Sequence, residues 1–302
     1  YIPAELFERW GQKDPLSSYE MFLLQQGVLD SDKINRIRDV FRREIEQAID
    51  VVEKPIVADS VKELADCYAS PSPSEASAKE DPSAEASEDQ PPFAKASEGK
   101  TEKRMIDAIR EGLMQSMELH ENLILMGQDI AEDGGAFKIT EGFLEKFDRE
   151  RVRNTPLCES AIVGAALGLS LEGFKSVMEM QFADFVTVGF NQIVNTLAKI
   201  HYRWKQNADV VIRMPTGAGV GAGPFHSQSN EAWFTHVPGL KVVYPSNPED
   251  AKGLLMAAIN DPNPVLYFEH KALYRSISGP LPEDYYYTEI GKAKLVQEGT
   301  DI

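Results

Sequence analysis

Three stretches of the sequence combine residue types that carry chemistry in enzymes. The first begins at Thr155 and places Glu159 before an Ala- and Gly-rich segment that continues to Gly168. The simpler interpretation of Glu159 is a helix-dipole partner, because acidic residues are favoured in a first helical turn. The alternative is a buried acid that holds or shuttles a proton. The small residues after it let another backbone approach closely, which suits a helix packed on another subunit or domain.

The second stretch is rich in glycine from Pro215 to Gly223 and leads into His226. It lacks the Gly-Lys-Ser/Thr of a phosphate-binding loop, and Pro224 rather than a helix follows the glycines. We interpret it as a loop at the carboxyl end of a strand, where open α/β sheets bind ligands. Imidazole titrates near neutral pH, so His226 is the natural proton donor of this loop. A hydrogen-bonded structural histidine would give the same pattern.

The third stretch runs from Glu179 to Phe185 and places aromatic residues after a strand. Aromatic residues in this position usually belong to the core, but a ring such as Phe185 can also stack on a heteroaromatic ligand. The other histidines are scattered singly, and the sequence has no His-Glu-x-x-His pair or cysteine cluster, which argues against a zinc site. It also has no Gly-x-Ser-x-Gly nucleophile elbow.

The elements that position these residues alternate between helix and strand from residue 103 onward. Hydrophobic spacing predicts helices over 105–119, 159–171, 185–204 and 249–259, and strands over 123–127, 176–180, 210–213, 241–244 and 265–268. This alternation favours a parallel sheet with helices on both faces. A loop from about Pro280 to Tyr287 follows, and a second domain is expected to begin near Gly291.

Two regions precede this α/β domain. Residues 1–68 are predicted to be helical, with a cap at Ser17–Glu20 and a second amphipathic helix after Asp30. A region this short is a marginal domain, so we expect it to pack on something else. Residues 69–103 are rich in Ser, Ala, Pro and acidic residues and cannot bury enough apolar surface to fold. We interpret them as a disordered linker, with a phosphorylated Ser/Pro-rich tail as the alternative.

The composition narrows the functional classes. The formal charge of −17 and the pI of about 4.8 argue against nucleic-acid binding, which needs clustered Lys and Arg. Cys67 and Cys158 give no disulfide framework, which fits a reducing cytoplasm. No apolar run is long enough for a membrane span, and no signal peptide is visible. The chain begins at Tyr1 and stops at Ile302 within an expected strand, so both ends look cut, and the true termini, with any targeting signal, are expected to lie outside it.

Taken together, these stretches resemble the beta subunit of the decarboxylating component of 2-oxo acid dehydrogenases. The resemblance runs from about Arg104 to the end, and residues 1–59 resemble the last helices of the alpha subunit less specifically. It implies a fused alpha/beta chain in four parts. These are the alpha end (1–68), the linker (69–103), a transketolase-like pyrimidine-binding domain (104–285) and the start of a transketolase C-terminal-like domain (286–302). The segments that carry it are Asp133–Phe137, Thr155–Gly173, Glu179–Arg203, Phe225–Ser229, Pro238–Ser246 and Asp250–Leu255.

The resemblance implies that thiamine diphosphate lies between an alpha-type and a beta-type domain, as the electron sink for loss of carbon dioxide. Glu159 matches the family glutamate that hydrogen-bonds the aminopyrimidine ring nitrogen and favours the imino tautomer. Phe185 matches the aromatic residue that packs on the aminopyrimidine, with Leu157 and Gln181 nearby. His226 matches the histidine that manages protons as the acyl group passes to lipoamide.

The resemblance also bears on metals. Ala258, Asp261 and Asn263 fall where some members bind a structural potassium ion through carbonyl and carboxamide oxygens, although a helix-ending turn here needs no ion. The Gly-Asp-Gly motif with its later Asn, which holds the diphosphate and magnesium, belongs to the alpha part and is absent. Nearly all of the second beta domain is absent too. The chain is therefore expected to hold half a cofactor site and to decarboxylate nothing by itself.

The expected partners are the lipoyl-bearing acyltransferase core of the complex and a second fused chain, giving the equivalent of an alpha2beta2 tetramer. Gln181–Phe185 leans towards branched-chain 2-oxo acids such as 3-methyl-2-oxobutanoate (2-oxoisovalerate), whereas Asn247–Ala251 looks more like pyruvate enzymes. The alternatives are a pyruvate or acetoin dehydrogenase component, or a transketolase-type enzyme with other residues in place of Phe225–Ser229. A non-catalytic interaction module would have no reason to place Glu159, Phe185 and His226 in one cleft.

Overall fold

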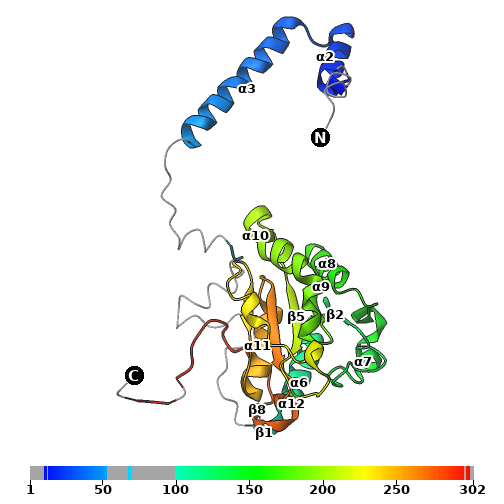
Figure 1. Ribbon diagram of the computed structural model, residues 1–302, viewed down its shortest axis with the longest axis vertical. Coiled ribbons are helices and arrows are strands. Elements are labelled where there is room, and N and C mark those ends of the chain that lie inside the picture. Colours follow the sequence, from blue (N-terminus) through cyan, green and yellow to red (C-terminus); the bar gives the residue numbers. More distant parts are fainter. Residues whose placement is uncertain (1–9, 12, 53–66, 70–98, 296, 300–302) are drawn as a thin grey trace. The chain divides into compact units, whose positions relative to one another are not determined.

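The computed structural model describes residues 10–11, 13–52, 67–69, 99–295 and 297–299 (Figure 1). The chain divides into two compact units, Tyr1–Asp59 and Ser60–Ile302, which are described separately. No helix among the described residues is long and apolar enough to cross a membrane.

The first unit contains two helices, α2 (Pro15–Gln25) and α3 (Ser31–Val52). Asp14 caps α2, since its carboxylate accepts a hydrogen bond from the backbone N–H of Ser17 at 2.8 Å. The predicted cap at Ser17–Glu20 was therefore wrong, because Pro15 is pre-organised for a first helical position and starts the helix earlier. Asp30 accepts from the N–H of Lys33 at 2.7 Å and caps α3, which begins at Ser31, close to the helix start that the sequence predicted.

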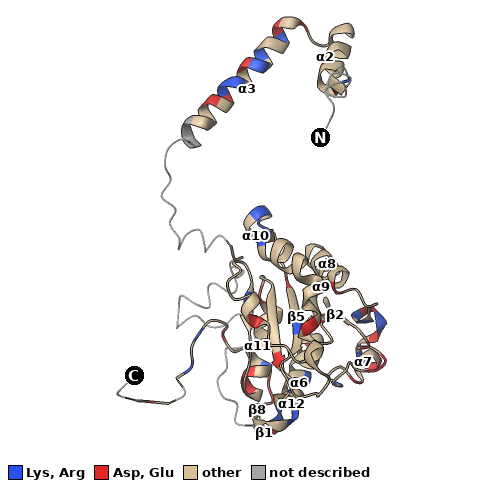
Figure 2. Ribbon diagram, viewed as in Figure 1, with Lys and Arg blue, Asp and Glu red and all other residues tan. Residues whose placement is uncertain are grey.

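Helix α3 is amphipathic, and charged residues occur along its length (Figure 2). Its apolar row is exposed to solvent within this unit, which agrees with the expectation that the region packs on a further surface. The row consists of Ile37, Val40, Phe41, Ile45 and Ile49.

The second unit is built on a six-stranded sheet in which every pair of neighbouring strands is parallel. The strand order is β3-β2-β4-β5-β7-β6. The predicted parallel sheet is thus confirmed. The strands are β2 (Leu123–Gly127), β3 (Val152–Asn154), β4 (Lys175–Glu179), β5 (Val210–Thr216), β6 (Lys241–Val243) and β7 (Val265–His270).

Helices cover both faces of the sheet (Figure 1). Side chains alternate between the faces along each strand, so Val211 joins one core and Ile212 the other. The first core contains residues of α6 (Met105–Leu119), α7 (Phe143–Arg151), α11 (Pro248–Asn260) and α12 (Leu273–Ser276). The second contains residues of α8 (Glu159–Leu171), α9 (Val186–Asn191) and α10 (Ala198–Trp204).

The predicted helix over 185–204 is present but irregular. A 3₁₀ turn, η1 (Ala183–Phe185), leads into α9, and a π-helical segment, η2 (Gln192–Leu197), separates α9 from α10. Periodicity does not reveal such a segment, because one wider turn shifts the apolar face only slightly.

Two short strands correct the predicted boundaries. Strand β1 (Lys100–Arg104) pairs antiparallel with β8 (Ser278–Pro282). The last residues of the predicted linker and the first of the predicted loop after Pro280 are therefore ordered. Neither strand has an alternating apolar pattern, so only their mutual pairing defines them. The interior of the predicted linker, 70–98, lies outside the described residues.

Lys252 on α11 links this peripheral region to the two helices α6 and α11. Its side chain is fully buried, and Nζ donates to Glu111 Oε1 at 2.8 Å. It also donates to the carbonyl oxygens of Pro282, Glu283 and Asp284, at 2.9, 3.2 and 2.9 Å. Burial lowers the pKa of Lys252, and the Glu111 carboxylate opposes that shift.

Replacing Lys252 with Met should destabilise the protein by about 2–3 kcal/mol, because three carbonyl groups and a carboxylate lose a buried donor. The measurement is the urea midpoint of unfolding at constant m-value. Lys146→Met is the matched control, since Lys146 pairs with Glu118 in an exposed position and should cost at most about 1 kcal/mol. Equal effects of the two substitutions would contradict the anchoring role of Lys252.

His120 gives the fold a specific pH dependence. Burial, followed by the charges of Lys175 and Arg151, lowers the pKa of His120 from 6.5 to about 4. Between these values the unfolded chain binds a proton that the folded chain does not, so this residue makes stability fall as pH falls from 6.5 towards 4. His120→Gln should flatten the decrease in melting temperature between pH 7 and pH 5 relative to the unsubstituted protein. Parallel curves for the two proteins would rule out this contribution.

Candidate functional site

The connections of the sheet mark one switch point at its carboxyl edge, which we term the crevice. The chain leaves β2 for β3 on one side, whereas β4 leads on to β5 and β7 on the other. Ligands of open α/β sheets bind where the strand order reverses, which here lies between the ends of β2 and β4. These ends approach closely, because a Cβ at Gly127 would lie 3.0 Å from the carbonyl oxygen of Glu179.

Glu159 lies at this crevice as a buried carboxylate. It is the first residue of α8 and is 8% exposed. Gln128, which directly follows β2, donates from Nε2 to Glu159 Oε1 at 3.2 Å. The other polar atom of this amide, Gln128 Oε1, is buried without a hydrogen-bond partner among the described residues. Gly189 lets α9 pack closely on α8, since a Cβ there would lie 3.3 Å from Val163 Cγ2.

The structure brings Phe185 and His226 together, with their ring centroids 5.5 Å apart in an edge-to-face arrangement. Phe182 completes the cluster, 4.8 Å from His226 and 5.9 Å from Phe185. His226 Nδ1 is buried without a hydrogen-bond partner in the described part of the chain. Gln181 is half-buried just before these aromatic residues. Two of the predicted site residues are thus in direct contact, and a third, Glu159, begins the neighbouring helix.

Asp184 fastens the histidine loop to η1. Its Oδ1 accepts from the backbone N–H groups of Ser227 and Gln228, both at 3.1 Å. Asn230 adds a second link, because its Nδ2 donates to the carbonyl oxygen of Ala183 at 2.9 Å. Sequence reasoning missed Asp184, although a buried acid between two aromatic residues was a usable signal.

Lys271 was also missed. It directly follows β7, is 6% exposed, and its Nζ lies 5.2 Å from the centre of the Phe182 ring. Nζ has no hydrogen-bond partner among the described residues. Burial lowers the pKa of Lys271, and the charge of Asp184 opposes this shift. The sequence does carry a signal for Lys271, because a lysine directly after a strand places a charge at the carboxyl edge of the sheet.

A buried ion-pair network lies on the other face of the sheet. Arg213 on β5 is 1% exposed and donates to Glu269 at 2.7 and 2.8 Å and to Glu179 at 2.6 Å. The Tyr274 hydroxyl donates to Glu269 at 2.5 Å. Burial opposes the charge of Arg213, but Glu269 and Glu179 outweigh it and raise its pKa. For Glu179, in contrast, burial itself raises the pKa, against the attraction of Arg213.

Large apolar side chains near the crevice are exposed, including Leu157 at 80% and Phe225 at 74%. Helix α8 has no charged residue after Glu159 (Figure 2). Its outward side is made of small residues, all exposed. They are Ala161, Gly164, Ala165 and Gly168. Such a surface suits close contact with another domain or subunit, as the sequence predicted.

The three predicted potassium ligands lie apart from the crevice, because α11 ends beside the amino end of β7. The Ala258 carbonyl accepts from the N–H of Asp261 at 3.2 Å. The carboxylate of Asp261 pairs with Lys241 and also accepts from Asn263. The potassium ion remains a prediction. Among the described residues, no group of three or more His, Cys, Asp or Glu side chains is placed to hold a metal ion.

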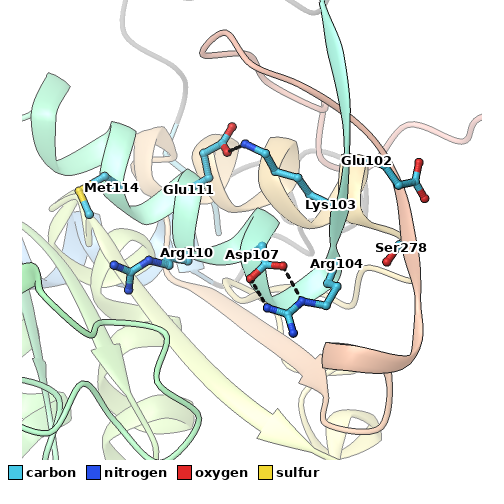
Figure 3. Close-up of a pocket in the computed structure, with 8 residues that line it drawn as sticks. All are labelled: Glu102, Lys103, Arg104, Asp107, Arg110, Glu111, Met114 and Ser278. Carbon is cyan, nitrogen blue, oxygen red and sulfur yellow. Dashed lines mark hydrogen bonds and ion pairs between the residues drawn. The ribbon is translucent and has the colours of Figure 1, made fainter.

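A pocket between α6 and β1 is separate from this site (Figure 3). Its charges compensate one another, since Arg104 binds Asp107 at 2.6 and 2.9 Å and Lys103 pairs with Glu111. None of the predicted site residues lines it. The lining consists of Glu102, Lys103, Arg104, Asp107, Arg110, Glu111, Met114 and Ser278.

The sequence profile of the family described as "Transketolase, pyrimidine binding domain" matches residues 101–276. This chain belongs to that family. The match covers the six-stranded sheet and the residues described at its carboxyl edge, whereas the first unit, residues 67–69 and β8 lie outside it. The transketolase-like pyrimidine-binding fold expected from the sequence is therefore confirmed.

The curated relatives of this pyrimidine-binding domain confirm the resemblance to beta subunits. The "2-oxoisovalerate dehydrogenase subunit beta" of Bacillus subtilis (strain 168) is 48% identical over 199 residues, which are 65% of this chain and 61% of that protein. The "Pyruvate dehydrogenase E1 component subunit beta" of Acholeplasma laidlawii is 42% identical over 200 residues, 66% of this chain and 61% of that protein. The chain thus spans about three fifths of the length of these relatives.

Among solved structures, a similar chain is described as "Split gene transketolase, inactive beta4 tetramer". It has a TM-score of 0.44 and 21% sequence identity, and the similarity covers 54% of this chain and 49% of that chain.

Replacing Asp184 with Ala should release the histidine loop of the pyrimidine-binding domain. The amides of Ser227 and Gln228 lose their acceptor, so their hydrogen exchange should accelerate by about tenfold or more. Asp184→Asn is the matched control, since its amide oxygen still accepts both bonds and should preserve most of the protection. Unchanged exchange in the Ala variant would show that the loop is held by other contacts.

Proposed function

We propose that this chain contributes the pyrimidine-binding half of a thiamine-diphosphate-dependent 2-oxo acid dehydrogenase, which transfers the resulting acyl group to lipoamide. The observation that carries the proposal is the buried Glu159 carboxylate at the switch point of the sheet, in a member of this family. The contact between Phe185 and His226 adds support.

The residues at the crevice fit an aminopyrimidine. A buried carboxylate at Glu159 is the group needed to hold a ring nitrogen, and the unpartnered Gln128 Oε1 offers an acceptor beside it. Phe185 supplies a half-buried aromatic face, and Leu157 an exposed apolar side chain. Thiamine diphosphate, when bound, supplies the nucleophilic carbon and the electron sink for loss of carbon dioxide.

The proposed roles of the protein side chains rest on the family resemblance, and their positions support them. Glu159 would hold the pyrimidine ring nitrogen of the cofactor and exchange a proton with it. Phe185 would fix the plane of that ring. His226 would hold or move a proton during acyl transfer, and its unpartnered Nδ1 is available for a hydrogen bond. The Asp184 bonds to the loop keep His226 in place.

The rest of the cofactor site belongs to an alpha-type domain, which would supply the diphosphate and magnesium ligands. We assign 1–68 to the end of that part and 286–302 to the start of the second beta domain. The exposed small-residue side of α8 is the surface on which such a domain or a second fused chain would pack. The lipoyl-bearing acyltransferase core is the proposed further partner.

The proposed substrate is a branched-chain 2-oxo acid, with pyruvate as the second candidate. The relative at 48% identity is named for 2-oxoisovalerate, and a second relative of Bacillus subtilis (strain 168), at 44%, is named for pyruvate. One methylene group in an apolar pocket contributes only about 1–3 kcal/mol, so a few residues decide between them.

The deciding assay uses the complete protein that carries this chain, with thiamine diphosphate, magnesium and a dye electron acceptor. Turnover that requires the cofactor supports the proposed class, and kcat/KM for 3-methyl-2-oxobutanoate should exceed that for pyruvate by about tenfold or more. A reversed ratio would assign the enzyme to pyruvate. Binding of the cofactor without turnover of either acid would point to another thiamine enzyme.

In the same protein, Glu159→Gln should lower kcat by about 10²–10⁴-fold, the usual contribution of a general acid-base group. Glu172→Gln, at the exposed far end of the same helix, is the matched control and should leave kcat unchanged. Loss of activity in both variants, or in neither, would contradict the role of Glu159.

A further inference from the structure

The amino edge of the sheet holds a short segment that precedes residues 70–98. Ala69 is 6% exposed and lies against Asn263, which is 2% exposed. The N–H of Ala69 donates to Asn263 Oδ1 at 2.6 Å, and Asn263 Nδ2 donates to the carbonyl oxygen of Ala69 at 3.1 Å. One side-chain amide thus binds both polar backbone groups of a single residue, as a neighbouring strand would. Tyr68 adds a bond from its hydroxyl to the carbonyl oxygen of Leu240 at 3.2 Å.

Asn263 is oriented for this contact by bonds that do not involve Ala69. Its N–H and its Nδ2 donate to Asp261 Oδ1 at 3.0 and 2.9 Å, which fixes the side-chain rotamer and leaves Oδ1 of Asn263 facing the segment. Asp261 is fixed in turn by its ion pair with Lys241. A receptor held in place in this way loses little conformational entropy on binding.

We infer that Lys241, Asp261 and Asn263 form a receptor for extended backbone, and that its occupant is this chain's own segment Cys67–Ala69. The segment suits this receptor for two reasons. The Asn263 amide binds only backbone groups of Ala69, and the small Ala69 side chain needs no pocket. This assignment does not depend on the proposed function. It also gives the Asn263 carboxamide a partner other than the potassium ion predicted for it.

The test uses the full chain and the alkylation rates of its two cysteines, resolved by mass spectrometry. Both thiols are half-buried, so the rate at Cys158 serves as an internal reference for the rate at Cys67. Asn263→Ala should raise the rate at Cys67 about tenfold and leave Cys158 unchanged, because only the segment is released. Asn260→Ala is the matched control, since its amide bonds Met256 and Tyr285 instead and should not affect Cys67.

A second variant keeps the receptor intact. Tyr68→Phe removes only the bond to Leu240 and should raise the Cys67 rate about threefold, without any change in the melting temperature of the domain. The Ala69 amide should also exchange its hydrogen more slowly in the unsubstituted chain than in Asn263→Ala. Equal Cys67 rates in the unsubstituted chain and Asn263→Ala would overturn the proposal. A rise in the Cys67 rate specific to potassium over sodium would assign the amide to the ion and overturn it too.

Discussion

The buried guanidinium of Arg213 is the constraint on which the carboxyl edge of the sheet depends. It lies on the central strand and holds carboxylates from the two neighbouring strands, Glu179 and Glu269. Two acids face one cation, and the Tyr274 hydroxyl adds a further donor to Glu269. Without Arg213 two carboxylates would be buried unpaired, a far larger cost than the net value of the ion pairs.

The ion-pair network and the candidate site residues lie on opposite faces of the sheet. Arg213 belongs to the face covered by α6 and α11, whereas Glu159 and Phe185 belong to the side of α8 and α9. The network therefore fixes the strand ends from the face that α6 and α11 cover, and the α8 and α9 face is not needed for this. Asp184 extends the fixed region upward, because it joins η1 to the loop that carries His226.

The parts of this architecture that were predictable are those that a local pattern determines. Continuous apolar runs such as Leu123–Gly127 predict buried strands, and the spacing in Met105–Leu119 predicts a helix. Glu159, Phe185 and His226 were identifiable because each lies in a distinctive local sequence. The pairing of β1 with β8, the Asp184 bonds to the loop and the contact of Ala69 with Asn263 were not, because they join residues far apart in the chain.

The carboxyl edge of the sheet holds buried polar atoms that the described residues do not satisfy. Gln128 Oε1, His226 Nδ1 and Lys271 Nζ have no partner among them. Each such atom costs about 1–3 kcal/mol, which a domain accepts where a ligand or water completes the bonds. An unpartnered atom alone does not mark a binding edge, since His120 Nε2, just before β2 at the amino edge, has no such partner either. The carboxyl edge differs because its three unpartnered atoms come from an amide, an imidazole and an ammonium group at the ends of separate strands and loops, which together offer a ligand both donors and acceptors.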